Sequence, residues 1–187
     1  MMRRIVVGIT GATGSIYALR LLKKLNSLTN VEVHLIISSS GVLTLHNELG
    51  IRINKLHSMV SVVHNFKNIG DVLASGSFRT DGMLIVPCSI RTLSAIANGL
   101  SDNLIVRAAD VSLKERRPIV LMVRESPFNL IHLRNMISVT EMGGIIFPPM
   151  PAFYHKPASI EEMVDHTVIH AMRLLNIEVP GPVWEGI

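Results

Sequence analysis

Residues 8–14, with the sequence Gly-Ile-Thr-Gly-Ala-Thr-Gly, are the strongest candidate for a phosphate-binding turn. They follow an apolar run and precede a helical pattern, so the glycines can bring the backbone close to an anion at a helix N-terminus. We favour a nucleotide or flavin phosphate over a purely structural turn. Short-chain NAD(P)-dependent enzymes share this spacing, but they place an acidic or basic ribose-binding residue after the second strand. That position here holds Ser38, Ser39 and Ser40, which suit a phosphate or cap the next helix.

Three further segments place polar side chains where strands are expected to end. Residues 87–92 (Pro-Cys-Ser-Ile-Arg-Thr) combine hydroxyls with a cation, and residues 123–127 place Arg124 beside Glu125. Residues 151–157 form an aromatic and basic loop between prolines. Residues 87–92 indicate an anion or ring-edge contact, and Arg124 and Glu125 lie at the expected ligand edge. The equally good alternatives are a helix cap with an exposed arginine for 87–92, a surface ion pair for 123–127 and a packed surface loop for 151–157. Cys88 is the only cysteine, and a lone cysteine is more typical of a core position than of a nucleophile.

A basic helix is predicted over residues 104–115. Arg107 and Lys114 are seven residues apart and therefore share one helix face, with Asp110 between them. Two cations on one face could hold a phosphate, although a solvated charge ladder is the commoner arrangement. The eight histidines are scattered, and His166 and His170 share a helix face without a carboxylate at metal-ligand spacing. No metal site is therefore predicted.

Short apolar runs alternate with helical patterns, and these are the elements that must position the polar residues. Strands are expected over 4–10, 31–37, 83–86, 119–123 and 144–147, and helices through 16–25, 43–49, 92–97, 104–115 and 160–175. Ser126 and Pro127 are predicted to cap and begin a further helix, and Ser159 to cap the last one, whereas residues 51–80 show no clear pattern. This alternation predicts an α/β fold with a doubly wound, mainly parallel, Rossmann-like sheet, whose ligands bind beyond the carboxyl ends of the strands. No linker divides the chain, so residues 1–187 are expected to form one domain.

Composition narrows the classes of function. Apolar residues make up 48% of the 187 residues and charged residues 17%, which excludes a disordered chain. The net charge is only +4 and aromatic residues are few, so we expect no nucleic-acid partner. Glycines interrupt the apolar N-terminus and no apolar stretch is long enough for a membrane span, so a cytoplasmic protein without a signal peptide is expected. The excess of apolar residues must be buried inside the fold or between subunits.

Taken together, these segments resemble the UbiX-type flavin prenyltransferases, whose older labels include phenylacrylic acid decarboxylase and 3-octaprenyl-4-hydroxybenzoate carboxy-lyase. The resemblance covers nearly the whole chain, and several independent segments occur in the family's order. They are residues 7–14 (VGITGATG), 75–83 (SGSFRTDGM), 87–89 (PCS) with 92–94 (TLS), 107–110 (RAAD) with 113–118 (LKERRP), 124–125 (RE), 131–133 (IHL), 148–155 (PPMPAFYH) and Trp184.

The resemblance implies a flavoprotein that joins a dimethylallyl group from dimethylallyl phosphate to reduced FMN. In the family, flavin N5 bonds to the first prenyl carbon as phosphate leaves, and a second bond closes at flavin C6 without a metal. The product, prenylated FMN, serves a separate UbiD-type decarboxylase, so the older labels describe the pathway. The family also forms large homo-oligomers, typically dodecamers, with active sites at subunit contacts.

The resemblance also assigns site residues by position. The FMN-binding positions are Gly11, Ala12, Thr13, Ser38, Ser89, Ile90, Arg91, Thr92 and Arg124. The positions of the prenyl-phosphate pocket are Arg107, Lys114, Tyr154 and His170, with Trp184 as a nearby aromatic residue. The catalytic assignments are Thr13, the acidic residue Glu48, and Glu125 as the proton-transfer group.

Two positions depart from the family pattern. Thr13 replaces the serine of many members and keeps the hydroxyl, whereas His170 replaces a phosphate-binding arginine that neutral imidazole imitates less well. Arg173, nearly one helical turn later, is a candidate substitute. An FMN-binding carrier without prenyl transfer is therefore the alternative. A flavin-dependent cysteine decarboxylase is disfavoured because residues 87–92 lack the Pro-Ala-Ser-Ala-Asn-Thr-like motif of those enzymes.

Overall fold

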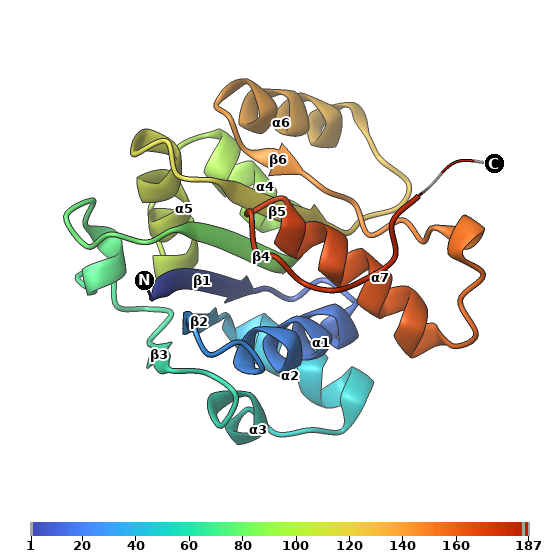
Figure 1. Ribbon diagram of the computed structural model, residues 1–187. Helices are drawn as coiled ribbons and strands as arrows, with labels where there is room; N and C mark the ends of the chain where they lie inside the picture. The colour runs from blue at the N-terminus through green and yellow to red at the C-terminus, as the bar shows by residue number, and fades with distance from the viewer. Residues whose placement is uncertain (1, 185, 187) are drawn as a thin grey trace.

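Six parallel strands form the central sheet of the computed structural model, which describes residues 2–184 and 186. The strand order is β3-β2-β1-β4-β5-β6, and every pair of neighbours is parallel. The bounds are β1 Arg3–Ile9, β2 Val31–Ile37, β3 Val62–His64, β4 Gly82–Cys88, β5 Ile119–Val123 and β6 Ile145–Ile146. The predicted doubly wound, parallel α/β sheet is thus confirmed (Figure 1).

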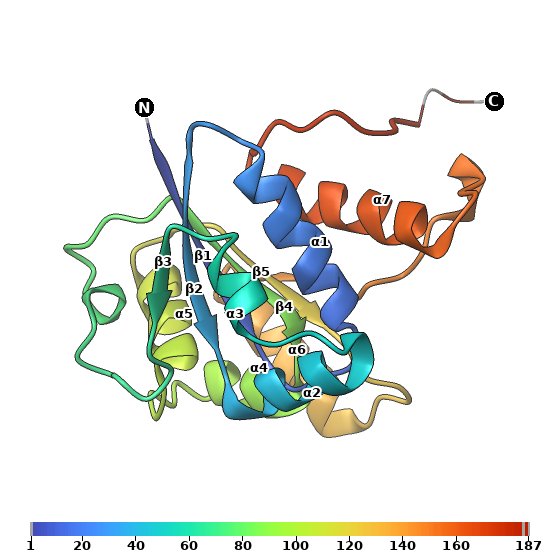
Figure 2. The same ribbon diagram turned by 90° about the horizontal axis from the view of Figure 1, so that it is seen from below.

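Helices cover both faces of this sheet (Figures 1 and 2). On one face, α1 (Ser15–Asn26) packs against α7 (Ile160–Arg173). On the other face lie α4 (Ile90–Ala97), α5 (Leu104–Lys114) and α6 (Leu130–Glu141). The remaining elements are α2 (Ser39–Leu49), α3 (Asn54–His57) and the short 3₁₀ turns η1 (Val72–Ala74) and η2 (Phe153–His155). No helix among the described residues combines the length and the apolar character needed to cross a membrane.

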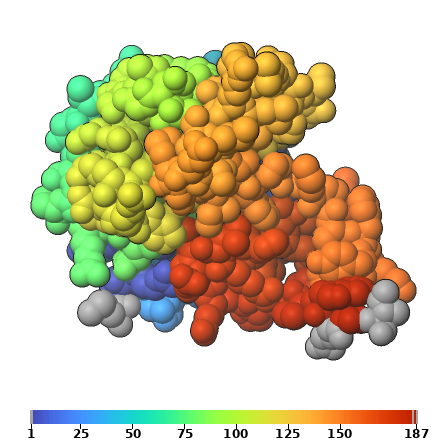
Figure 3. Space-filling view, turned by 90° about the horizontal axis from the view of Figure 1, so that it is seen from above, coloured from blue at the N-terminus to red at the C-terminus, as the bar shows by residue number. Residues whose placement is uncertain are grey.

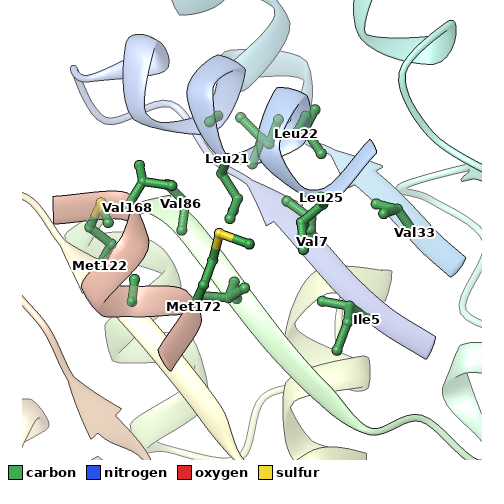
Figure 4. Packing of buried hydrophobic residues seen from close by; sticks show 14 of the residues in the cluster. Ile5, Val7, Leu21, Leu22, Leu25, Val33, Val86, Met122, Val168 and Met172 are labelled. Atoms are coloured by element: carbon green, nitrogen blue, oxygen red, sulfur yellow. The ribbon is translucent and has the colours of Figure 1, made fainter. Parts of the chain in front are cut away.

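Alternate residues of the inner strands supply two separate cores. Ile5 and Val7 of β1 belong to the core with Leu22 of α1 and Met172 of α7 (Figure 4), whereas Val6 belongs to the core beneath α4 and α5. Because both faces of the strands are buried, β4, β5 and residues 5–9 of β1 appear in the sequence as continuous apolar runs, whereas Glu32 and His34 interrupt the run of β2. Part of the aliphatic and methionine excess is therefore accounted for inside the fold.

The strand order reverses next to β1. The chain passes from β1 through α1 to β2, whereas β4 pairs with the opposite edge of β1. The loops that follow β1 and β4 therefore diverge at the carboxyl edge of the sheet and leave a crevice between them. The polar turns that begin at Gly11, Ser38 and Ser89 all follow strands at this edge.

The structure corrects one predicted helix boundary. Ser126 and Pro127 do not begin α6, which starts at Leu130 with Asn129 as its cap. Asn129 Oδ1 accepts a hydrogen bond from the His132 backbone N–H at 3.0 Å, and His132 Nδ1 accepts one from the Asn129 N–H at 3.3 Å. This reciprocal arrangement satisfies two backbone donors at the helix start, so it fixes the boundary three residues later than the Ser-Pro pair suggests.

Candidate active site

The turn between β1 and α1 is packed too tightly to accept a side chain at Gly11. A Cβ atom at this position would lie 2.5 Å from the Cβ of Ser40 at the start of α2. Thr44 Oγ1 donates to the Gly11 carbonyl at 3.3 Å, which ties the turn to α2. Gly14 has a φ of 108°, in the region that favours glycine. The glycines therefore allow the turn to lie directly against the N-terminal end of α2.

Two serine-capped helices begin beside this turn. Ser38 Oγ accepts from the Gly41 N–H at 3.0 Å at the start of α2, and Ser89 Oγ accepts from the Thr92 N–H at 3.3 Å at the start of α4. Thr10 joins the two strand ends, because its Oγ1 accepts from the Ser89 N–H at 2.8 Å and donates to the Pro87 carbonyl at 2.7 Å.

The positive ends of α2 and α4 therefore border one cavity of about 620 Å³. We call this cavity the cradle; its lining residues are 10–11, 38–40, 66–67, 89, 91–92 and 102–103. Of the predicted FMN positions, Gly11, Ser38, Ser89, Arg91 and Thr92 line it, and Ala12, Thr13 and Ile90 belong to the same turns.

Two arginines lie at the carboxyl edge of the sheet near the cradle. Arg91 Nη2 lies 2.5 Å from Asp102 Oδ2, so an ion pair holds this guanidinium at the wall. Arg124 is exposed and follows β5, where its backbone N–H donates to the Cys88 carbonyl at 3.1 Å. Cys88 itself is fully buried, and burial raises the pKa of its thiol. The prediction that Cys88 is a packed residue is confirmed.

Glu48 of α2 closes the N-terminus of α1. Its carboxylate accepts from the Gly14 N–H at 3.1 Å and from the Ser15 N–H at 2.8 Å. Burial acts to raise the pKa of Glu48, but hydrogen bonds from Thr13, Ser15 and Gly14 outweigh it, and the pKa lies below its usual value. The N-terminus of α1, which the glycine turn suggested as an anion site, is therefore filled by a carboxylate. The helix starts that border the cradle are those of α2 and α4.

Replacing Glu48 with glutamine should lower the free energy of unfolding by about 1 kcal/mol at neutral pH, because a charged helix cap becomes neutral. A carboxylate with a lowered pKa stabilises the fold above the pKa of the unfolded glutamate, and this contribution is lost as the pH falls through the folded value. The difference between wild type and Glu48→Gln should therefore shrink on acidification. Urea unfolding at about pH 7 and about pH 4 measures it. Glu141→Gln, at an exposed position, is the control, and a difference that persists unchanged in acid would contradict the capping role.

The two cations of α5 lie outside the cradle. Arg107 Nη1 pairs with Asp110 Oδ2 at 2.6 Å, and Arg107 Nε donates to the Ala74 carbonyl at 3.1 Å. Lys114 is exposed at the last turn of α5, where it pairs with Glu115. Because α5 runs antiparallel to the strands, Lys114 lies toward the amino edge of the sheet, opposite the cradle.

A second cavity, of about 420 Å³, contains Tyr154, His170 and Trp184 in its wall. The rings of Tyr154 and Trp184 meet edge to face, with centroids 5.1 Å apart. Arg173 also lines this cavity, but its guanidinium donates to three carbonyls of residues 179–182 at 3.0 to 3.2 Å. Arg173 therefore holds the C-terminal segment and is not a free replacement for the missing arginine at position 170. Among the described residues, the second cavity and the cradle share no lining residue.

The predicted site residues are thus found at three separate places in one chain. The cradle, Glu48 and Arg124 lie at the carboxyl edge of the sheet, together with Glu125, whose Oε1 accepts from the Ser126 N–H at 3.0 Å. The α5 cations and the second cavity are the other two places.

Known proteins resemble this chain along its whole length. A family model described as Flavoprotein matches residues 1–172. The flavin prenyltransferase UbiX of Neisseria meningitidis is 47% identical over 188 aligned residues, which cover 100% of this chain and 99% of that protein. The chain belongs to the UbiX family of flavin prenyltransferases.

Solved UbiX structures share the fold as well as the sequence. AnUbiX (PadA1), described in complex with FMN and dimethylallyl pyrophosphate, has a TM-score of 0.94 and 44% identity, covering 99% of this chain and 100% of that one. A dodecameric FMN-dependent UbiX-like decarboxylase from Escherichia coli O157:H7 has a TM-score of 0.95 and 40% identity, covering 98% and 100%. The predicted family and its Rossmann-like fold are confirmed.

Several cradle residues of this UbiX chain were missed by the sequence reasoning. Thr10 lies inside the predicted glycine turn but was not assigned a role, because its linking role depends on contacts 77 and 79 residues away in the chain. Phe66 and Lys67 lie in the segment that showed no pattern, and Asn103 directly precedes the helix predicted over residues 104–115. The one available signal was the position of Thr10 and Asn103 next to predicted strand and helix ends.

Proposed function

We propose that this UbiX protein transfers a dimethylallyl group from dimethylallyl phosphate to reduced FMN. The observation that carries the proposal is a cradle at the switch point of the sheet, in a chain that matches prenyltransferases from end to end. The product, prenylated FMN, would pass to a UbiD-type decarboxylase in the cytoplasm. Since both cores are built on one sheet, we also infer that residues 1–187 act as a single FMN-binding domain.

The cradle has the donors that an FMN phosphate requires. Ser38 Oγ accepts its capping bond, which leaves the hydroxyl proton available to an anion, and backbone N–H groups at the starts of α2 and α4 add further donors. Gly11 keeps the adjoining wall free of a side chain. Arg91 and Arg124 supply positive charge nearby, and Ala12, Thr13 and Ile90 complete the proposed contacts. Reduced FMN supplies the N5 and C6 atoms to which prenyl carbons become bonded as phosphate leaves.

The leaving phosphate requires charged or polar donors, which we assign to Arg107, Lys114, Tyr154 and His170. Preorganised donors of this kind stabilise a developing phosphate charge. We assign the proton transfer to the carboxylate of Glu125. Glu48, held ionised by its hydrogen bonds, orients the Thr13 hydroxyl beside the cradle.

We propose that contacts between copies of the chain bring these three places together. On α6, Leu130, Ile131 and Ile137 are 59%, 57% and 57% exposed, which is unusual for large apolar side chains of a monomer. Phe153 and Trp184 are also more than half exposed. Figure 3 shows α6 in gold and the segment after β6 in orange on one face of the molecule. We propose a homo-oligomer, a dodecamer like the solved relative, whose interfaces cover these side chains and complete the site.

The second candidate function, an FMN carrier without prenyl transfer, is favoured by His170. Under prenyl transfer, the function proposed first, His170→Arg should lower the KM for dimethylallyl phosphate about tenfold. The reason is that guanidinium is always charged and can bind phosphate through two N–H groups. The FMN dissociation constant should not change, because His170 does not line the cradle. Steady-state kinetics and FMN titration measure the two quantities, with His46→Arg at an exposed position as control. An unchanged KM would remove His170 from the phosphate site.

A coupled assay tests the proposed function. The protein is incubated without oxygen with reduced FMN and either dimethylallyl phosphate or dimethylallyl pyrophosphate, and the released flavin is added to an apo-decarboxylase of the UbiD type. Activation with the phosphate supports the proposal, and activation only with the pyrophosphate corrects the donor. Bound FMN with no activation from either donor selects the carrier.

A further inference from the structure

Two buried histidines outside the cradle contact each other. His34 on β2 and His64 on β3 are 2% and 8% exposed, and parallel pairing of the two strands brings them together. Their rings stack with centroids 5.1 Å apart, and His34 Nδ1 lies 2.8 Å from His64 Nε2. Prenyl transfer as proposed above makes no use of either ring.

Each end of this histidine pair meets a carboxylate. His64 Nδ1 lies 2.8 Å from Asp71 Oδ1, and His34 Nε2 lies 3.1 Å from Glu32 Oε1. Glu32 also pairs with Arg4 of β1 at 3.1 Å. The row therefore contains two ring-to-carboxylate contacts and one ring-to-ring contact on β2 and β3, and the ion pair of Glu32 with Arg4 extends it to β1.

Other charged groups around the pair are already engaged. The Arg4 guanidinium lies 4.8 Å from the centre of the Phe78 ring, whose edge meets His34, and Asp81 Oδ2 accepts from the Arg4 backbone N–H at 2.8 Å. On α5, which packs against η1, Arg107 and Asp110 pair with each other. The carboxylates that can accept a hydrogen bond from the ring N–H groups of the pair are therefore Asp71 and Glu32.

The contacts limit how many protons the pair can hold. A carboxylate oxygen at 2.8 Å favours a proton on His64 Nδ1, which leaves His64 Nε2 to accept from His34 Nδ1. A third proton fits on His34 Nε2, facing Glu32. A fourth would set two N–H groups against each other across 2.8 Å. Burial, reinforced by the neighbouring His64, lowers the pKa of His34 and also opposes full protonation. The closed pair thus carries one positive charge at most, whereas two separated histidines can carry two.

The contact between His64 and Asp71 joins the two ends of the loop formed by residues 65–70. We call the loop closed when this contact is made and open when it is broken. Phe66 and Lys67 of this loop line the cradle, and the Phe66 carbonyl accepts from the Leu104 N–H at 2.9 Å. Asp71 also caps η1, where its Oδ1 accepts from the Leu73 N–H at 3.2 Å. The histidine pair therefore lies two residues from the cradle wall, at the point where the loop begins.

We propose that His64 is a positioning residue for the cradle and that the His34–His64 pair makes FMN binding weaken in mild acid. The inference rests on FMN binding at the cradle, as proposed above. When the contact between His64 and Asp71 breaks and the loop opens, the two rings separate and can bind one more proton than in the closed loop. Acid therefore favours the open loop, and neutral pH favours the closed loop. One extra proton limits the effect to about a tenfold loss of affinity for each pH unit below the ordinary histidine pKa of ~6.5.

FMN titration of the full chain at about pH 7.5 and about pH 5.5 tests this inference. His34→Asn removes one titrating ring and places an amide opposite His64 Nε2, and the amide oxygen can accept from a protonated His64, so the closed loop no longer excludes that proton. His46→Asn, at an exposed position, is the control. Wild type and the control should lose about tenfold more FMN affinity over this pH range than His34→Asn. Because the FMN phosphate titrates in the same way with every variant, this comparison between variants cancels its contribution. His64→Phe should bind FMN more weakly at both pH values.

Equal pH dependence in wild type and His34→Asn would overturn the inference and leave FMN binding intact. Absence of FMN binding even at about pH 7.5 would overturn the proposed function as well. A second measurement needs no variant. In the FMN-bound wild type, NMR titration of the imidazole C–H signals should show one ring of the pair still neutral at about pH 5.5. Two fully protonated rings would contradict the proton count.

Discussion

Lys114→Ala should lower the rate of prenyl transfer by about 10²–10³-fold and leave the FMN dissociation constant unchanged. Lys114 is exposed at the end of α5, pairs with Glu115 and does not line the cradle. We expect a phosphate brought by another copy of the chain to compete with Glu115 for this ammonium group. Because the side chain is exposed, its removal should cost little stability, so the loss of rate reports on the chemistry.

Steady-state kinetics with dimethylallyl phosphate, together with FMN titration, separates the two effects of Lys114→Ala. Lys23→Ala removes an equally exposed lysine from the last turn of α1 and should retain wild-type rates. If Lys114→Ala lost FMN affinity and transfer rate in equal measure, Lys114 would belong to the flavin site and its assignment to the leaving phosphate would be wrong.

Gly11→Ala should weaken FMN binding by about 10–100-fold, which corresponds to about 1.4–2.8 kcal/mol. The new Cβ would lie 2.5 Å from the Cβ of Ser40, and a Cβ cannot rotate away as the end of a long side chain can. Either the turn or the start of α2 must move. Both border the cradle, so the donors of Ser38 and the neighbouring backbone leave their positions.

Gly70→Ala is the matched control for Gly11→Ala. A Cβ at position 70 would meet nothing closer than the Asn68 Oδ1 at 3.6 Å, and Gly70 does not line the cradle. FMN titration by fluorescence, with circular dichroism to check folding, compares the two variants. Wild-type affinity in Gly11→Ala would show that the flavin does not depend on this turn.

Much of the fold could be predicted because the inner strands are buried on both faces. β5 and residues 5–9 of β1 are continuous apolar runs next to turn residues, and such runs have few alternatives. β2 includes Glu32 and His34, but it ends in the apolar run of residues 35–37. The start of α6 was placed too early because Ser126-Pro127 has the right residue types. The actual cap, Asn129, depends on a reciprocal bond with His132 that residue types alone do not reveal.

The cradle could be predicted in part for the same local reason. Ser38 and Ser89 directly follow strands and Gly11 lies two residues after β1, so strand position alone brought them to one edge. Glu48 was different, because it reaches the glycine turn from 34 residues away and only the family resemblance pointed to it. The pairing of His34 with His64 depends on the register of a three-residue edge strand, which no periodicity in the sequence marks.

The division of the remaining site residues among three places could not be read from the sequence. Spacing showed that Arg107 and Lys114 share a helix face, but not that the end of α5 lies opposite the cradle. In the homo-oligomer proposed above, contacts between copies of the chain would decide whether such residues meet. The sequence indicates such contacts only as an excess of apolar residues, part of which lies exposed on α6.

The mass of the flavin recovered after anaerobic incubation with reduced FMN and dimethylallyl phosphate tests directly whether this protein prenylates FMN. We expect a flavin heavier than FMN by one five-carbon prenyl unit, with inorganic phosphate released in equal amount. Recovery of unmodified FMN from protein that binds it, with either dimethylallyl phosphate or dimethylallyl pyrophosphate as donor, would contradict prenyl transfer by this protein.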